Sequence, residues 1–286
     1  MKPRTLLAAA AGRLAEAGVA SPEYDARTLL AHVLGIRIGR LDLLAVVPAE
    51  NARTFRALVD ERARRVPLQH LTGVAGFRRL DLAVGPGVFV PRPETEVLVE
   101  WVLSRLAGIA SPVVVDLCAG SAAIALAVAD EAPAARVYAV EREAHAAAWA
   151  RRNLDAHPAG SRVHLQHGDI DGALPELDGA VDVVVANPPY IPDGAEVERE
   201  VAEHDPPAAL WGGLDGLDVV RVVIATAVRL LRPGGVLGVE HADRQGDAVP
   251  ALIGATAMGR LSELADRPDL NGRPRFTTAV RTEAPA

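Results

Sequence analysis

The spacing of apolar residues changes twice along the chain. In residues 1–75 apolar positions recur every three or four residues, which is typical of helices that bury one face. Ser21-Pro22-Glu23 has the composition of a helix start and Gly35 that of a helix end, and Pro67 stops a further helix over about residues 50–65. The pattern predicts an N-terminal domain over residues 1–75 that is made of helices only.

A strand-like alternation follows in the stretch "GFRRLDLAVGPGVFVPRPETE", residues 76–96. Gly85-Pro86-Gly87 interrupts this alternation with residues that favour tight turns. We therefore expect a β-hairpin that turns at these three residues. Residues 76–94 are interpreted as a β-hairpin linker between two domains.

The remaining residues, 95–286, alternate short apolar runs with helical patterns. The predicted strands cover residues 112–118, 136–141, 162–169, 181–187 and 234–241. Helices are predicted over 122–132 and 143–156, whereas two late strands surround Asn271-Gly272 with no helix between them. Strands that alternate with helices form a mostly parallel sheet that is covered on both faces. The predicted fold class is therefore α/β, with a doubly wound sheet and a smaller helical domain.

Composition and length agree with two unequal globular domains. The chain has 286 residues, of which 50% are hydrophobic and 23% charged. Its single cysteine, Cys118, excludes a disulfide within the chain and favours a reducing compartment. Arg13 and Glu16 interrupt the apolar start "MKPRTLLAAAAG", and no apolar run is long enough to span a membrane. We expect a cytoplasmic protein without membrane contact.

Charge is distributed unevenly between the two parts. Residues 1–75 carry 11 Lys+Arg against 7 Asp+Glu, a net charge of +4, whereas the remainder has a net charge of −11. An acidic main body argues against direct nucleic-acid binding, which normally uses a basic face. The N-terminal cluster of Arg62, Arg64 and Arg65 is either a solvated helix face or a docking site for an acidic partner.

Three acidic residues lie at or near the ends of predicted strands. Asp116, Glu141 and Asp169 occupy these positions in the first three strands of the sheet. In doubly wound sheets, ligands bind beyond the carboxyl ends of the strands. Glu141 is placed to accept hydrogen bonds from a ribose diol.

The loop "CAGSAA" follows the first of these strands and opens a helix. Small residues let a ligand approach the backbone, and a helix N-terminus attracts a carboxylate or phosphate. These features are compatible with a nucleoside-type ligand. They are equally compatible with a tightly packed turn whose carboxylates only cap helices.

Asn187-Pro188-Pro189-Tyr190 ends the fourth strand with an unusual turn. Asn187 offers a side-chain carbonyl, and the two prolines offer carbonyls while lacking N–H donors of their own. Tyr190 can stack on a flat group. The combination suits a planar –NH2 group, whose two hydrogens need two fixed acceptors.

This turn resembles the signature of S-adenosylmethionine-dependent methyltransferases that modify planar amino or amide nitrogens. Further stretches are similar to the peptide chain release factor glutamine N5-methyltransferase family, called HemK or PrmC. They are "PLQHLTGVAGF", "VFVPRPETEVLVEW", "GGLDGLDVVR" and "GRPRF". The resemblance runs from about residue 67 to the C-terminus, and the helical residues 1–66 agree with that family in kind. It implies a seven-stranded Rossmann-like methyltransferase domain with an N-terminal helical bundle.

The resemblance also implies a reaction and its residues. Family members methylate the side-chain amide of the glutamine in the Gly-Gly-Gln loop of class I peptide chain release factors. Asn187, Pro188, Pro189 and Tyr190 would form the catalytic turn. The residues implied for the cofactor S-adenosyl-L-methionine are Asp116, Cys118, Ala119, Gly120, Ser121, Ala122, Glu141, Asp169, Ile170, Asn187, Phe89, Pro91 and Arg92. No metal is implied, and we expect a monomer.

The chain departs from the family in its cofactor loop, where Cys118 and Ala122 stand at two positions that are usually glycine. A Cβ there either narrows the cofactor channel or opposes a positive φ. Two alternatives therefore remain: a DNA adenine-N6 methyltransferase, and a non-catalytic binding module with a degenerate cofactor loop. We also expect the arginine cluster to dock the release factor away from its glutamine loop.

Overall fold

The computed structural model describes residues 1–283, and the chain divides into two compact units. One unit contains Met1–Val74 together with Val197–His204. The other contains Ala75–Glu196 and the chain from Asp205 onward. Each unit has a hydrophobic core of its own.

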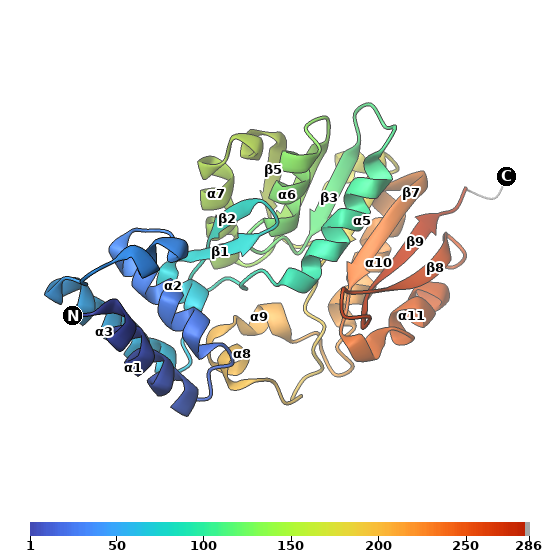
Figure 1. Cartoon of the computed structure of the whole chain (residues 1–286). Coiled ribbons are helices and arrows are strands. Elements are labelled where there is room, and N and C mark those ends of the chain that lie inside the picture. The colour runs from blue at the N-terminus through green and yellow to red at the C-terminus, as the bar shows by residue number, and fades with distance from the viewer. Residues whose placement is uncertain (284–286) are drawn as a thin grey trace. The chain divides into compact units, whose positions relative to one another are not determined.

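Helices build the first unit (Figure 1). They are α1 (Pro3–Glu16), α2 (Pro22–Leu34), η1 (Ile38–Leu43), α3 (Ala49–Ala63), α4 (Leu68–Thr72) and α8 (Arg199–His204). Leu14, Leu29 and Phe55 are fully buried and belong to one core. Gly35 ends α2 with a φ of 63°, which confirms the predicted stop and explains the glycine, because L-residues disfavour this conformation.

The arginine cluster of this unit is a structural element, and the docking prediction based on it is wrong for Arg62. That side chain is 8% exposed, and its guanidinium pairs with Asp25 and Glu200 at 2.7 Å each. Arg65 donates to the Gly18 carbonyl and also pairs with Glu200. Arg64 is 69% exposed and pairs with Glu61 on its own helix. Burial against carboxylates outside the local sequence thus removes most of the expected basic surface.

A two-stranded hairpin opens the second unit, and its turn differs from the prediction. Strands β1 (Val74–Phe77) and β2 (Leu80–Ala83) are joined at Arg78-Arg79. Arg78 has a φ of 52°, and Glu131 and Glu96 hold its side chain and its backbone N–H. Tertiary contacts therefore support a turn that the local sequence does not suggest.

Gly85-Pro86-Gly87 does not form the predicted hairpin turn but packs against a helix. A Cβ on Gly85 would lie 2.7 Å from the Trp149 ring, and a Cβ on Gly87 would lie 3.1 Å from His145. Trp149 also donates from its indole nitrogen to the Pro86 carbonyl. The glycines thus permit close packing on α7 (Ala144–Ala156) rather than a hairpin turn.

Seven strands form the main sheet of the second unit, in the order β5-β4-β3-β6-β7-β9-β8. They are β3 (Val113–Leu117), β4 (Arg136–Glu141), β5 (Val163–His167), β6 (Val181–Ala186), β7 (Leu231–Glu240), β8 (Leu261–Pro268) and β9 (Pro274–Arg281). The first five in chain order are parallel, and β9 pairs antiparallel with β7 and β8. The predicted doubly wound α/β class and the two late strands are confirmed.

Helices cover both faces of this sheet (Figure 1). They are α5 (Glu96–Leu106), α6 (Ala123–Glu131), α7, α10 (Asp218–Leu230) and α11 (Ala248–Thr256), and the short helix α9 (Pro207–Leu210) belongs to the same unit. Short 3-10 turns connect the elements: η2 (Pro93–Thr95), η3 (Pro158–Arg162), η4 (Pro175–Leu177) and η5 (Asp243–Gln245). Val114 belongs to one core cluster while Val113 and Val115 belong to the other, as the alternation of a strand requires.

The carboxyl ends of the parallel strands are level with one another. Leu117 on β3 is opposite Val140 on β4 and Ala186 on β6, and Glu141 is opposite His167 on β5. Backbone bonds link the turns that follow, such as Ala119 N–H to the Val140 carbonyl at 3.0 Å. This edge therefore brings together segments that are far apart in the sequence.

Candidate active site

The loop after β3 is built from left-handed backbone conformations. Cys118, Gly120 and Ala122 have φ values of 65°, 57° and 64°. The side chains of Cys118 and Ala122 are strained there, at a cost of about 1 kcal/mol each. A Cβ added to Gly120 would meet no atom within 4 Å, so its backbone is open to a ligand. The positive φ at all three positions disfavours large or branched side chains.

Asp116 lies directly beneath this loop and is 1% exposed. Its Oδ2 accepts the Ala125 N–H of α6 at 3.0 Å, whereas its Oδ1 has no hydrogen-bond partner among the described residues. Burial, with a smaller contribution from the Glu141 charge, raises the pKa of Asp116 to about 8. At neutral pH the carboxyl group is therefore mostly protonated, and a positively charged ligand beside its unpartnered oxygen would favour the ionised form.

Glu141 at the end of β4 supports the loop from the other side. Its two carboxylate oxygens accept the N–H groups of Gly120 and Glu143, each at 2.7 Å. A carboxylate offers about four acceptor positions, so both oxygens keep capacity for a diol. Burial and these acids raise the pKa of the Cys118 thiol, which keeps it protonated. Neutral Cys118 among acids suits a cationic ligand better than a phosphate.

The other residues predicted for the cofactor lie outside this loop. Asp169 is exposed and accepts from the Asp171 N–H at 3.0 Å, and Ile170 is buried. Arg92 pairs with Asp205 at 2.7 Å and lies over the Phe89 ring. The guanidinium of Arg92 is thus already engaged by protein groups. Buried Ser121 is tied to α7 through its carbonyl, which accepts from Asn153 at 3.0 Å.

The turn after β6 is fixed by an unexpected partner. The side-chain nitrogen of Asn187 donates to the Thr95 hydroxyl at 3.1 Å. Thr95 belongs to the "PRPETE" stretch, so the two segments that carried the family resemblance are in direct contact. Because the Asn187 nitrogen is used, its carbonyl oxygen is the part of the amide that remains to accept from a substrate.

The rest of this turn is clamped by backbone and side-chain bonds. Pro188 and Pro189 are buried, and the Tyr190 carbonyl accepts from Gln245 at 3.0 Å. A Cβ on Gly212 would lie 2.7 Å from the Pro189 carbonyl oxygen, so the "GGLDGLD" stretch packs on the turn. Burial raises the pKa of Tyr190 above its usual range, so its phenol stays neutral.

Sequence reasoning missed Thr95 and Glu240 as parts of the site. Glu240 ends β7 and is 2% exposed, and its Oε2 has no hydrogen-bond partner among the described residues. A signal was present, because Glu240 is an acidic residue at the end of a predicted strand, as Glu141 is. His145 is exposed, whereas His241 is fully buried against Thr277 and Asp266.

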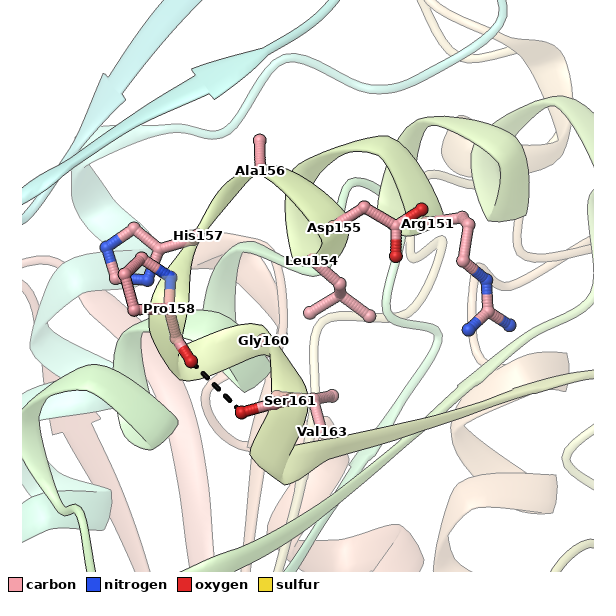
Figure 2. A pocket seen from close by; sticks show the side chains of 9 residues that line it. All are labelled: Arg151, Leu154, Asp155, Ala156, His157, Pro158, Gly160, Ser161 and Val163. Atoms are coloured by element: carbon pink, nitrogen blue, oxygen red, sulfur yellow. Dashed lines mark hydrogen bonds between the residues drawn. The ribbon is translucent and has the colours of Figure 1, made fainter.

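A hollow of about 630 Å³ lies elsewhere on this unit (Figure 2). It is lined by the end of α7, by η3 and by Val163, the first residue of β5. Since β5 is parallel to its neighbours, this hollow is at the opposite edge of the sheet from the loop and the turn. Figure 2 shows the Ser161 hydroxyl bonded to the Pro158 carbonyl within its own segment. Because of its position at the opposite edge, the hollow is not part of the site.

Two features are absent from residues 1–283. Nowhere in this range do three or more His, Cys, Asp or Glu side chains gather so that they could hold a metal ion. Every helix in the same range is too short or too polar to span a lipid bilayer.

The fold, the loop after β3 and the turn after β6 define a methyltransferase. Residues 66–204 match the family model described as "Methyltransferase small domain". The solved structure of P. horikoshii TYW2 in complex with MeSAdo has the same fold, with a TM-score of 0.50 and 13% identity. That alignment covers 73% of this chain and 71% of the other.

Relatives narrow the class to one family. Residues 5–73 match the model "PrmC N-terminal domain". Release factor glutamine methyltransferases of Streptomyces coelicolor and Mycolicibacterium smegmatis are 51% and 49% identical, over 96% and 97% of this chain and the same shares of theirs. The chain belongs to the release factor glutamine methyltransferase family.

A further relative is named for another substrate. The 4-amino-L-phenylalanine/4-methylamino-L-phenylalanine methyltransferase of Streptomyces pristinaespiralis is 44% identical over 95% of this chain and 92% of its own. The predicted family, fold class and dependence on S-adenosylmethionine are confirmed by these relations. The roles of individual site residues stay predictions.

Proposed function

We propose that this chain transfers the methyl group of S-adenosylmethionine to the side-chain nitrogen of the glutamine in the Gly-Gly-Gln loop of class I peptide chain release factors. The observation that carries this proposal is the bond from Asn187 to Thr95, because it leaves the Asn187 carbonyl as an acceptor for a substrate amide. The nearly full-length similarity to release factor glutamine methyltransferases supports the same substrate.

The residues present fit the cofactor. The open backbone of Gly120, the unpartnered Oδ1 of Asp116 and the carboxylate of Glu141 would hold its polar groups. The bound cofactor supplies an electrophilic methyl group on a sulfonium. The acidic surroundings of the loop favour a cationic ligand by simple charge attraction.

The turn after β6 would act by positioning the substrate. A glutamine amide nitrogen is a weak nucleophile because its lone pair is delocalised into the carbonyl. Asn187 Oδ1 and the Pro188 carbonyl would accept its two hydrogens, orient the nitrogen and stabilise the positive charge that grows on it. The neutral phenol of Tyr190 would pack against the amide plane and is no base. The proton leaves after transfer, so no general base is needed.

We further propose that the enzyme works as a monomer in the cytoplasm and without contacting nucleic acid. The net charge of −11 beyond residue 75 supports the last point, because a basic surface is what the phosphate backbone requires. A single cysteine in the chain supports a reducing compartment.

The test is transfer of labelled methyl groups to a purified release factor. Label is expected on the wild-type factor and absent from a factor whose loop glutamine is replaced by alanine. Free 4-amino-L-phenylalanine and adenine-containing DNA serve as competing substrates, because both present a planar –NH2 group. Label on either of these, with none on the release factor, would overturn the proposal.

A further inference from the structure

A loop of the second unit, residues 212–217, packs directly on the turn after β6. Two of its glycines have no room for a side chain on the side that faces the turn. A Cβ on Gly212 would lie 2.7 Å from the Pro189 carbonyl oxygen, and a Cβ on Gly216 would overlap the Tyr190 carbonyl oxygen. Only glycine lets the two backbones approach so closely. The loop therefore borders the turn that is proposed to hold the substrate amide.

Backbone hydrogen bonds fasten this loop to the segment that follows the turn. The Gly212 N–H donates to the Ile191 carbonyl at 2.8 Å, and the Asp193 N–H donates to the Gly213 carbonyl at 2.9 Å. Within the loop, the Gly216 N–H donates to the Gly213 carbonyl at 3.1 Å. These bonds satisfy most of the polar groups of the loop backbone and give it one conformation beside the turn.

Asp215 anchors the other side of the loop. Its carboxylate accepts the Leu217 N–H at 2.9 Å and pairs with Arg221 on α10. The hydrogen bond from Arg221, followed by the one from Leu217, lowers the pKa of Asp215 to about 2. Asp215 is therefore ionised at neutral pH, and the loop is attached to α10 as well as to the turn.

Leu214 belongs to this loop and is 90% exposed. A single exposed leucine is ordinary on a protein surface. This one is carried by a loop that is held by the turn, by the segment after the turn and by α10, so its exposed position is set by the fold. Burial of an apolar side chain is favourable, and a leucine fixed in an exposed position offers that gain to a partner.

We propose that Leu214 is a specificity-determining residue, which contacts an apolar part of the release factor beside its Gly-Gly-Gln loop. This inference rests on the proposed function of the turn after β6. A protein substrate continues on both sides of its glutamine, and each residue of an extended chain spans about 3.5 Å. The residues that flank the glutamine must therefore pass over the segments that border the turn, and residues 212–217 border it at Pro189 and Tyr190.

Such a contact distinguishes a protein substrate from a small molecule with a similar –NH2 group. Free 4-amino-L-phenylalanine ends at its own backbone and has no flanking residues that could reach Leu214. Contact with Leu214 therefore adds affinity for the release factor alone, and a difference in affinity between two substrates is what specificity consists of.

The experiment measures kcat and KM for methylation of a purified release factor by four proteins: the wild type, Leu214→Ser, Leu214→Met and Met258→Ser. Leu214→Met keeps an apolar side chain. Met258→Ser is the matched control, because Met258 is 82% exposed and lies between α11 and β8, at the opposite edge of the sheet. Thermal melting and cofactor binding verify that each variant is folded.

Leu214→Ser should raise KM about tenfold, which corresponds to a loss of about 1.4 kcal/mol of apolar contact. It should leave kcat within about twofold of the wild type, because the turn that holds the reacting amide is unchanged. Leu214→Met and Met258→Ser should keep the wild-type KM within about twofold, since the first retains the apolar contact and the second lies away from it.

Photocrosslinking tests the same contact without kinetics. A benzophenone-bearing amino acid at position 214 should cross-link to the release-factor segment that contains the Gly-Gly-Gln loop, and mass spectrometry of the cross-linked peptides identifies that segment. The same amino acid at position 258 should give no cross-link to the factor. A cross-link from position 214 to a remote part of the factor would contradict the proposal.

The outcomes separate the two proposals. A wild-type protein that does not methylate the release factor overturns the proposed function itself. If the wild type does methylate it, while Leu214→Ser has the same KM as Met258→Ser, the specificity role alone is wrong. A Leu214→Ser variant that lowers kcat and leaves KM unchanged would also contradict this role, because it would place Leu214 in the chemical step rather than in substrate binding.

Discussion

The loop after β3 and the turn after β6 follow adjacent parallel strands at one sheet edge, yet they are held in place by different means. In the loop, backbone conformation dominates, with φ near 60° at Cys118, Gly120 and Ala122. In the turn, prolines fix the backbone, and the side chain of Asn187 is bonded to Thr95.

This difference explains which residues each segment tolerates. A left-handed backbone position disfavours any side chain by about 1 kcal/mol, but Cys and Ala are small enough to remain. The loop can therefore lose two glycines at a modest cost in stability. In the proposed function the turn depends on particular donors and acceptors, so a substitution there should remove a function rather than a conformation.

The largest effect should come from Asn187→Ala. Removing an acceptor that binds the substrate in the transition state should lower kcat about 100-fold, while the cofactor Kd changes about twofold or less. Methyl-transfer kinetics and calorimetry measure the two quantities. Asn271→Ala, at the exposed β8–β9 turn, is the control and should change neither. If Asn187→Ala raised the cofactor Kd by the same factor by which it lowered kcat, the turn would bind the cofactor as well. The separate roles of loop and turn would then be wrong.

A second test adds a methyl group to the loop. Gly120 and Gly35 have φ values of 57° and 63°, and neither Cβ would meet an atom within 4 Å. Gly120→Ala and Gly35→Ala should therefore each reduce the free energy of unfolding by about 1 kcal/mol. Only Gly120→Ala should weaken cofactor binding, by about tenfold or more, because its methyl would occupy the open side of the loop. Equal cofactor Kd values for both variants would contradict the proposed binding loop.

The third test is the pH dependence of stability. Asp116 has an ordinary pKa of 3.8 in the unfolded chain and about 8 in the fold. Between these values the folded chain binds more protons, so the free energy of unfolding should fall as pH rises. The contribution is at most about 1.4 kcal/mol for each pH unit.

Urea unfolding of the cofactor-free protein at pH 5 and pH 8 should show this loss. Asp116→Asn cannot ionise, so its loss over the same interval should be smaller by about 2 kcal/mol or more. The same variant should bind the cofactor more weakly, since an amide replaces a carboxylate beside a cation. Identical pH dependence in both proteins would show that Asp116 stays ionised in the fold.

The smallest effect concerns the strained loop itself. Cys118→Gly should be more stable than Cys118→Ala by about 1 kcal/mol, because only glycine adopts the left-handed conformation without strain. Ala122→Gly should change stability little, since the relief of strain is offset by the loss of a fully buried methyl. Urea unfolding of each variant measures these two changes in the free energy of unfolding. If Cys118→Ala were as stable as Cys118→Gly, the left-handed backbone at this position would not be strained.

Local sequence was a good guide wherever local rules decide the structure. Only spacing and residue type were needed for the end of α2 at Gly35, the strand that precedes Asn187 and the two strands around Asn271. The same holds for the resemblance carried by "PRPETE" and "NPPY". Local rules failed at Arg78-Arg79, where a turn forms because Glu131 and Glu96 hold Arg78. They failed again at Arg62, which is buried against Asp25 and Glu200 rather than exposed.

By itself, the sequence of this protein determined the alternation of strands and helices, the family, and the residues that reach the carboxyl edge of the sheet. These properties depend on periodicity and on short motifs, both of which involve only residues that are close together in the sequence. Only the tertiary structure decided that Thr95 contacts Asn187, that Asp116 lacks a partner for one oxygen, and that Glu240 is buried. Hydrogen bonding and desolvation depend on groups far apart in the chain, so their effect appears only when the sheet brings those groups together.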